Sequence, residues 1–281
     1  MKQRIITALI LAPLVVLGIF LLPIPFFILA LTAIAMLGFW EWTQFVEPKS
    51  RIMSLLPALV AVAASFFFIP FDSVSLGQAS DVHYAILSTG SMWWLVASLL
   101  ALTYPRSTCV WQKNIPLRHI FGILSLLPFL WSVFMLRAVD YAFDPLHGAK
   151  LVMYVCLLVW AADTGAYFTG KAIGKHKMAP KVSPNKTIEG LLGGVVLAMV
   201  IGWFVAKLFN IHFASLTTML LITFVTVVIS VLGDLVESMF KRVSNIKDSS
   251  NIIPGHGGIL DRIDSLMAAF PVFALLYFFC Q

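Results

Sequence analysis

Nine long apolar runs, separated by more polar connections, constrain this chain more than any other feature. A helix needs roughly 20 apolar residues to cross a bilayer, so nine would use about 180 residues of the 281 present. Apolar residues make up 60% of the chain and charged residues only 11%, against about 25% charged in soluble domains. One core in water cannot hide this much apolar surface. We therefore predict an all-α, polytopic integral membrane protein.

The expected spans define one integral membrane domain, residues 1–281. Within it, we interpret residues 1–145 mainly as scaffold, and residues 146–281 as the part that carries the active site. The nine predicted spans are Ile5–Leu22, Phe26–Trp42, Ile52–Pro70, Ala85–Tyr104, Ile120–Leu136, Leu151–Phe168, Gly190–Phe209, Phe213–Gly233 and Ile263–Cys280.

Basic residues predict the orientation of these spans. Of the 19 Lys and Arg residues, all but Arg137, Lys150 and Lys207 fall on the side that holds the N-terminus. The positive-inside rule makes that side cytoplasmic, with the C-terminus on the far side. The net charge of +6 then reports orientation and contact with anionic lipid. We expect the bilayer as a partner, and no nucleic acid.

The first half offers few candidate functional groups. Four tryptophans lie near span ends or inside spans, and we interpret them as interface anchors or lipid-facing packing; they are Trp93, Trp94, Trp111 and Trp131. Glu41 closes the second span. We interpret this helix-end carboxylate as structural.

Seven of the 13 acidic residues fall between Asp163 and Asp264. Asp234, Glu237 and Ser238 follow the i, i+3, i+4 spacing of one helical face, and Asp261 and Asp264 repeat the i, i+3 spacing at the start of the last span. Carboxylates at such positions are costly unless they are paired, metal-bound or hydrated. Mg²⁺ commonly takes one or two carboxylates together with substrate phosphates. The two pairs therefore predict a divalent cation site at one membrane face.

Three further features leave alternatives open. The glycine-rich run 254–258 suits an anion-binding turn, although such turns are common. The lysine-rich loop 171–187 is either a positive-inside signal that attracts anionic lipid or a cradle for phosphates. Asp163 interrupts an apolar span. It is either a polar contact between helices or a site carboxylate.

A long pattern unites the C-terminal residues. It reads Ser238-x-x-Lys241-Arg242, Lys247-Asp248, Pro254-x-His256-Gly257-Gly258 and Asp261-Arg262-x-Asp264. This pattern resembles the signature of the phosphatidate cytidylyltransferase (CDP-diacylglycerol synthase) family. Segments 162–167, 183–187 and 233–237 also resemble bacterial members. The resemblance is specific from Trp160 to Asp264, and in the first half it rests mainly on hydropathy.

The resemblance implies an enzyme of phospholipid biosynthesis. Members of the family condense CTP with phosphatidic acid, which gives CDP-diacylglycerol and pyrophosphate in a reaction that requires Mg²⁺. It further implies a multi-pass protein of the cytoplasmic (inner) membrane whose active site faces the cytoplasm. The number of metal ions, an accompanying monovalent cation such as K⁺, and a homodimer stay open.

Residue roles follow from this resemblance together with the charge pattern. Catalytic roles are expected for Asp234, Asp261, Lys241, Arg242, Asp248, His256, Arg262 and Asp264. Substrate binding is expected from Ser183, Asn185, Lys186, Thr187, Ser238, Lys247, Gly257, Gly258 and Asp163. Metal ligation is expected first from Asp234 and Asp261, then from Glu237 and Asp264. For His256 a purely loop-ordering role is the alternative.

Other classes explain the pattern less well. An ion-coupled transporter, the main alternative, also uses intramembrane carboxylates and glycine-broken helices. Here the carboxylates sit at span ends, however, and the two halves contain no matched pair of interrupted helices. Another membrane phosphotransferase is disfavoured because the sequence has no P-loop motif and no D-G-x-x-A-R arrangement.

Overall fold

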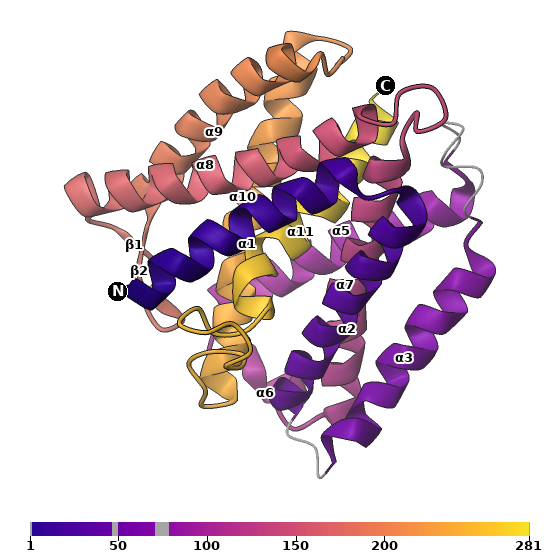
Figure 1. Ribbon diagram of the computed structural model, residues 1–281. Coiled ribbons are helices and arrows are strands. Elements are labelled where there is room, and N and C mark those ends of the chain that lie inside the picture. Colours follow the sequence, from indigo (N-terminus) through magenta and orange to yellow (C-terminus); the bar gives the residue numbers. More distant parts are fainter. Residues whose placement is uncertain (1, 47–49, 71–78, 281) are drawn as a thin grey trace.

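The computed structural model describes residues 2–46, 50–70 and 79–280, and most of this backbone is helical (Figure 1). Nine long helices are α1 (Lys2–Leu21), α2 (Ile24–Val46), α3 (Arg51–Phe68), α5 (Asp81–Leu102), α7 (Ile115–Ala138), α8 (His147–Ile173), α9 (Ile188–Phe209), α10 (Leu216–Val243) and α11 (Leu260–Phe279). A short helix, α6 (Thr108–Trp111), precedes α7. Strands β1 (Lys177–Ala179) and β2 (Ser183–Thr187) form an antiparallel hairpin between α8 and α9.

The nine long helices match the nine predicted spans in order, which confirms the predicted fold class. Among the described residues, eight helices are long and apolar enough to cross a membrane, and α1 adds the shorter apolar stretch Leu9–Leu21. The largest difference is that α10 continues to Val243, because buried residues such as Leu235 and Phe240 keep one face of it packed. The β1–β2 hairpin was not predicted. The orientation in the membrane stays a prediction.

The best-packed helices lie at the centre of the molecule. In α7, 72% of the apolar window is buried, whereas in α3, at one edge of the molecule (Figure 1), only 17% is. Large apolar side chains on the outer helices point outward, such as Leu14 at 60% and Phe204 at 56% exposure. This surface needs lipid rather than water around it. The chain is therefore a multi-pass membrane protein.

The interpretation of the four tryptophans as interface anchors or lipid-facing packing is wrong. All four are buried: Trp93, Trp94, Trp111 and Trp131. The indole N–H groups of Trp93 and Trp131 donate to Ser125 Oγ (2.9 Å) and Ser65 Oγ (3.0 Å) on neighbouring helices. Such a partner compensates the burial of these two indoles, whereas the buried indole N–H groups of Trp94 and Trp111 have no hydrogen-bond partner among the described residues.

Helices α8 and α9 pack through small residues. A Cβ on Gly194 would meet the carbonyl oxygen of Ala162 at 2.6 Å, and one on Gly165 would meet that of Gly193 at 2.8 Å. The backbones therefore approach more closely than larger side chains would permit, as is common between membrane helices.

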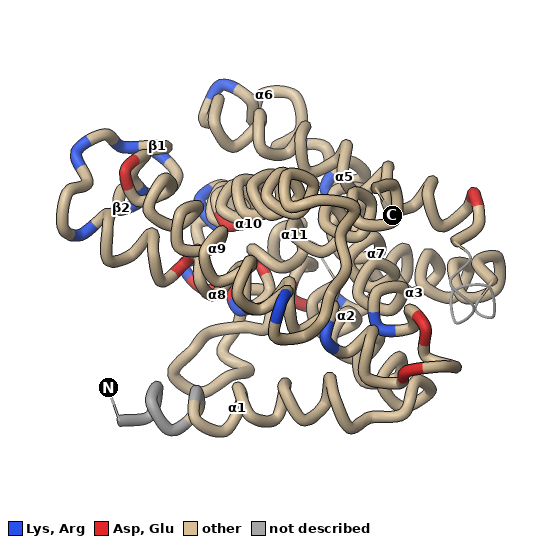
Figure 2. The backbone as a smooth tube through the Cα atoms, turned by 90° about the horizontal axis from the view of Figure 1, so that it is seen from above, with Lys and Arg blue, Asp and Glu red and all other residues tan. Residues whose placement is uncertain are grey.

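One end of the molecule, called here the site end, holds the start of α1 and the four connections that the charge pattern placed on the same side of the membrane: α2–α3, α5–α7, α8–α9 and α10–α11. Figure 2 shows Lys and Arg on the β1–β2 hairpin, with most of the tube uncharged. The contacts that join these segments are Thr7 Oγ1 to Pro254 O (3.0 Å), Arg118 Nη1 to Phe45 O (2.8 Å), Gln44 Nε2 to Ser249 O, and Arg242 Nε to Val182 O (3.1 Å).

Arg137 marks the opposite end. The residue is 2% exposed, and its guanidinium donates to the backbone carbonyls of Ile19 (2.9 Å), Leu22 (3.1 Å) and Pro145 (3.1 Å). A buried charge is tolerated when its hydrogen bonds are satisfied. Arg137 thus ties the α1–α2 and α7–α8 connections together.

Candidate active site

The extension of α10 supplies one face of the site. Ser238 Oγ donates to Asp234 Oδ1 (3.3 Å), and Lys241 forms an ion pair with Glu237 one turn before it. Glu237 is almost fully buried, at 1% exposure. The predicted i, i+3, i+4 face is therefore present, and it continues to Lys241.

Asp261, in the first turn of α11, joins that face to the glycine-rich loop. Its Oδ1 lies 2.9 Å from Lys241 Nζ. Its Oδ2 accepts from the backbone N–H groups of Ser249 (2.9 Å) and Gly258 (2.7 Å) and lies 3.1 Å from Ser249 Oγ. Both carboxylate oxygens are therefore engaged by the protein itself.

Two glycines make this loop geometry accessible. Gly257 has φ +86°, and a Cβ there would meet Asp261 Oδ2 at 2.5 Å. At Gly258 a Cβ would meet Ser249 Oγ at 2.0 Å and the carboxylate of Glu41 at 2.5 Å. Any side chain at either position would push the loop away from the carboxylates. In this structure the predicted anion-binding turn wraps carboxylates of the protein.

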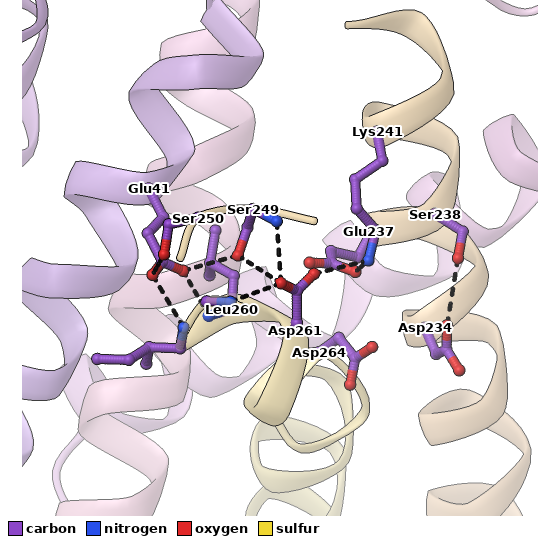
Figure 3. Close-up of polar contacts among 12 residues, drawn as sticks. Glu41, Asp234, Glu237, Ser238, Lys241, Ser249, Ser250, Leu260, Asp261 and Asp264 are labelled. Atoms are coloured by element: carbon purple, nitrogen blue, oxygen red, sulfur yellow. Dashed lines mark hydrogen bonds and ion pairs between the residues drawn. The ribbon is translucent and has the colours of Figure 1, made fainter. Parts of the chain in front are cut away.

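Glu41 is the residue that sequence reasoning placed outside the site. It is fully buried and lies within reach of four donors: the hydroxyls of Ser249 (2.8 Å) and Ser250 (2.6 Å) and the N–H groups of Ile259 (2.9 Å) and Leu260 (2.7 Å). Figure 3 shows these contacts running from Glu41 through Ser249 to Asp261 and Lys241. We call Glu41, Glu237, Lys241, Ser249 and Asp261 the buried cluster.

A second group of charges is more accessible. Lys186 Nζ on β2 lies 2.6 Å from Asp234 Oδ2, and these side chains are 22% and 28% exposed. Asp163 interacts electrostatically with both and is exposed, although α8 runs on to Ile173, about 15 Å further along its axis. Asp264 also interacts electrostatically with Asp234 and Lys186. We call Asp163, Lys186, Asp234 and Asp264 the open cluster.

The two clusters adjoin. Asp264 interacts electrostatically with Lys241, and Figure 3 shows it between Asp261 and the Asp234–Ser238 pair. In the described part of the chain, neither Asp163 nor Asp264 forms an ion pair at direct contact distance; Asp264 Oδ1 accepts only the N–H of Ser265 (2.7 Å). The open cluster therefore has carboxylate oxygens available to a ligand.

Other predicted residues are distributed around these clusters. Arg242, Lys247, Asp248, Arg262 and Asn185 are exposed, and Ser183 and His256 are half-buried. The ring Nδ1 of His256 is buried and has no hydrogen-bond partner among the residues that the structure describes. Thr187 is buried and caps α9, with its Oγ1 accepting from Gly190 N (3.1 Å). Its visible role is to begin that helix.

The carboxylates do not form a ready-made metal cage. Within residues 2–46, 50–70 and 79–280, no three His, Cys, Asp or Glu side chains come close enough to hold one ion together. The open cluster still offers two neighbouring carboxylates. Asp264 has no ion pair in the described structure, and Asp234 has one with Lys186, whose place at the carboxylate a cation would take. A hard cation that takes its remaining ligands from a phosphate substrate needs no more than this.

Comparison with known proteins identifies the family. A model of the cytidylyltransferase family matches residues 2–280. The chain belongs to the cytidylyltransferase family. A phosphatidate cytidylyltransferase of Haemophilus influenzae is 44% identical over 99% of both chains. Those of Pseudomonas aeruginosa and Bacillus subtilis are 43% and 34% identical over at least 96% of each chain.

These matches confirm the resemblance to phosphatidate cytidylyltransferases that residues 160–264 indicated. They show that the chain is an enzyme of the cytidylyltransferase family. They extend over the first half too, where the motif signal was weakest. A transporter is correspondingly disfavoured. The roles expected for individual residues stay predictions.

Proposed function

We propose that this enzyme condenses CTP with phosphatidic acid to give CDP-diacylglycerol and pyrophosphate. Relatives named for this activity match almost the whole chain at 34–44% identity. The observation that carries the proposal is the juxtaposition of the open and buried clusters at the site end. There, lysines on β2 and α10 lie beside carboxylates from three helices.

The reaction joins two anions, and this explains the need for cations. A phosphate oxygen of the lipid attacks the α-phosphorus of CTP in line, the bond from that phosphorus to the bridging oxygen breaks, and pyrophosphate leaves with the electron pair. Lys186 and Lys241, with the exposed Arg242 next to Lys241 and the exposed Arg262 next to Asp261, supply charge for the phosphates. Positioning and charge stabilisation account for most of such catalysis.

Mg²⁺ fits the open cluster in this proposal. Asp234 and Asp264 are hard oxygen donors, and two carboxylates plus substrate phosphates satisfy its usual ligand demand. When bound, the ion neutralises charge that builds up on the phosphates. Asp261 and Glu237, also expected as ligands, direct their carboxylates toward Lys241. We therefore assign them to holding that lysine.

The two substrates reach the site from different directions. CTP is water-soluble and approaches from the site end, which the positive-inside rule makes cytoplasmic; the membrane is then the inner membrane. The lipid keeps its acyl chains in the bilayer and brings only its phosphate to the level of Asp163. Exposed aromatic residues on α8, Tyr167 and Phe168, provide an apolar flank for that approach.

Product formation by the purified protein tests this function. Detergent-solubilised protein receives CTP labelled at the α-phosphate, phosphatidic acid and Mg²⁺, and label entering the organic phase is counted. We expect label only when lipid and metal are both present, with loss in EDTA. Asp234→Asn and Asp264→Asn should abolish most of it.

The result that overturns the proposal is equally defined. A folded, monodisperse protein that transfers no label with any of several phosphatidic acids is not this enzyme. Near-normal Mg²⁺-dependent turnover in both aspartate variants would refute the metal assignment while leaving the reaction in place.

A further inference from the structure

We infer that Glu41 is a positioning residue for the site: it holds the loop 249–258 and the start of α11 in the arrangement that presents Lys241. This inference rests on the proposed function for its kinetic consequence, but not for its geometry. Glu41 lies in α2, in the half of the chain interpreted as scaffold.

The first support is that Glu41, in α2, caps the N-terminus of α11. Helix α11 has no side-chain cap of its own at Ile259. The N–H groups of Ile259 and Leu260 instead donate to Glu41, which lies 219 residues from Leu260 in the sequence. A carboxylate at a helix N-terminus satisfies free N–H groups and interacts favourably with the helix dipole.

The second support is a continuous relay from Glu41 to Lys241. Ser249 Oγ lies between two carboxylates, 2.8 Å from Glu41 and 3.1 Å from Asp261, and has one proton to donate. Asp261 in turn contacts Lys241 Nζ at 2.9 Å. The position of Lys241 therefore depends on a residue that has no contact with it.

The third support is that neighbouring positions on α2 face the same loop. Gln44, one turn after Glu41, donates to the backbone carbonyl of Ser249. Gly38, one turn before it, lies beside the start of α11 as well: a Cβ there would be in ordinary contact with Leu260 Cδ2 at 3.4 Å, and closer, at 3.0 Å, to Leu126 Cδ2 on α7. A stripe along α2 is thus complementary to the loop and to the start of α11.

Glu41→Gln is the sharpest test because it preserves size. The amide nitrogen donates rather than accepts, so it would oppose donors that the carboxylate now binds. The control is Arg137→Gln, which removes a buried charge at the opposite end without touching the loop. Both variants should lower the thermal unfolding temperature.

Two readouts separate positioning from general stability. In Glu41→Gln we expect faster hydrogen exchange of backbone amides 249–260 and a KM for CTP raised about tenfold or more, the range for losing an outer-shell contact. Arg137→Gln should change neither. Ser250→Ala removes one donor to Glu41 without stranding a charge, and should shift both readouts in the same direction by less.

The contrary results are distinct. The inference is overturned if hydrogen exchange of the loop amides and the KM for CTP are the same in Glu41→Gln as in the control Arg137→Gln. This holds even if the unfolding temperature of Glu41→Gln is lowered. If that variant does not fold, Ser250→Ala decides in the same way. Should the wild type make no lipid product, the proposed function fails, and hydrogen exchange still decides whether Glu41 holds the loop.

Discussion

The buried and open clusters carry similar charges but use them differently. In the buried cluster, Glu41 accepts from hydroxyl and backbone N–H groups, and Asp261 accepts from such groups and from Lys241. In the open cluster, Asp163 and Asp264 have no direct cation partner in the described structure, and Lys186 and Asp234 are each more than a fifth exposed. A buried charge must be satisfied by the protein, whereas an accessible one is left for a ligand.

The largest effect is expected from replacing Lys241, because its ammonium group neutralises both Glu237 and Asp261. Lys241→Met leaves two carboxylates without their cation, and we expect a loss of about 3–5 kcal/mol in the free energy of unfolding. Chemical denaturation in detergent measures it. Lys241→Arg, which keeps the charge, should lose much less; equal losses would contradict the ion-pair explanation.

In the open cluster we expect a substitution to lower the activity while leaving the stability nearly unchanged. Asp264→Asn should lower kcat roughly 10²–10³-fold, the range for removing one charge-stabilising group. The unfolding temperature should hardly change, because Asp264 is only half-buried and forms no direct ion pair there. Asp144→Asn, whose exposed carboxylate lies 3.8 Å from Lys150, is the matched control. A large stability loss in Asp264→Asn would place it with the buried cluster.

Arg137 tests whether a buried charge held by backbone is purely architectural. Arg137→Gln strands carbonyls of Ile19, Leu22 and Pro145, at about 1–3 kcal/mol for each group left unsatisfied. The turnover of the folded fraction should equal that of the wild type in the labelled-CTP assay. A reduced kcat at full folding would show that the opposite end communicates with the site.

Gly258→Ala sharpens the comparison within the buried cluster. The added methyl group meets Ser249 Oγ at 2.0 Å, and we expect overpacking to cost about 1–3 kcal/mol and to raise the KM for CTP. Denaturation and steady-state kinetics measure the two effects. Gly18→Ala, where the nearest atom is 3.8 Å away, is the control and should behave as wild type.

The smallest effect is expected on the hairpin. Lys175 and Lys177 are exposed, so their replacement by alanine should not alter turnover in neutral detergent. On vesicles rich in anionic lipid, each lysine is worth about 1 kcal/mol of attraction at low salt, and this gain should vanish at high salt. Vesicle sedimentation measures binding. Lys207→Ala, at the opposite end, should bind as wild type does.

Much of the fold was predictable because the bilayer imposes one dominant rule. Apolar runs long enough to span must be helical, since an unpaired backbone is too costly in lipid. Boundaries were less predictable: the spacing of Asp234, Glu237 and Ser238 indicated a helical face past Gly233, but α10 continues to Val243 because its later residues are buried against neighbours. The tryptophans show the same limit, since Trp131 is buried through a partner on α3.

The sequence by itself determined the number of spans, the charge asymmetry and the residues of the C-terminal pattern, because each depends on composition or short-range spacing. Only the tertiary structure decided which of those residues belong to the buried cluster and which to the open cluster. It paired Lys186 with Asp234, enclosed Asp261, and brought Glu41 to the start of α11 across 219 residues. Such contacts depend on which helices pack together, and one chain's local pattern contains no record of that packing.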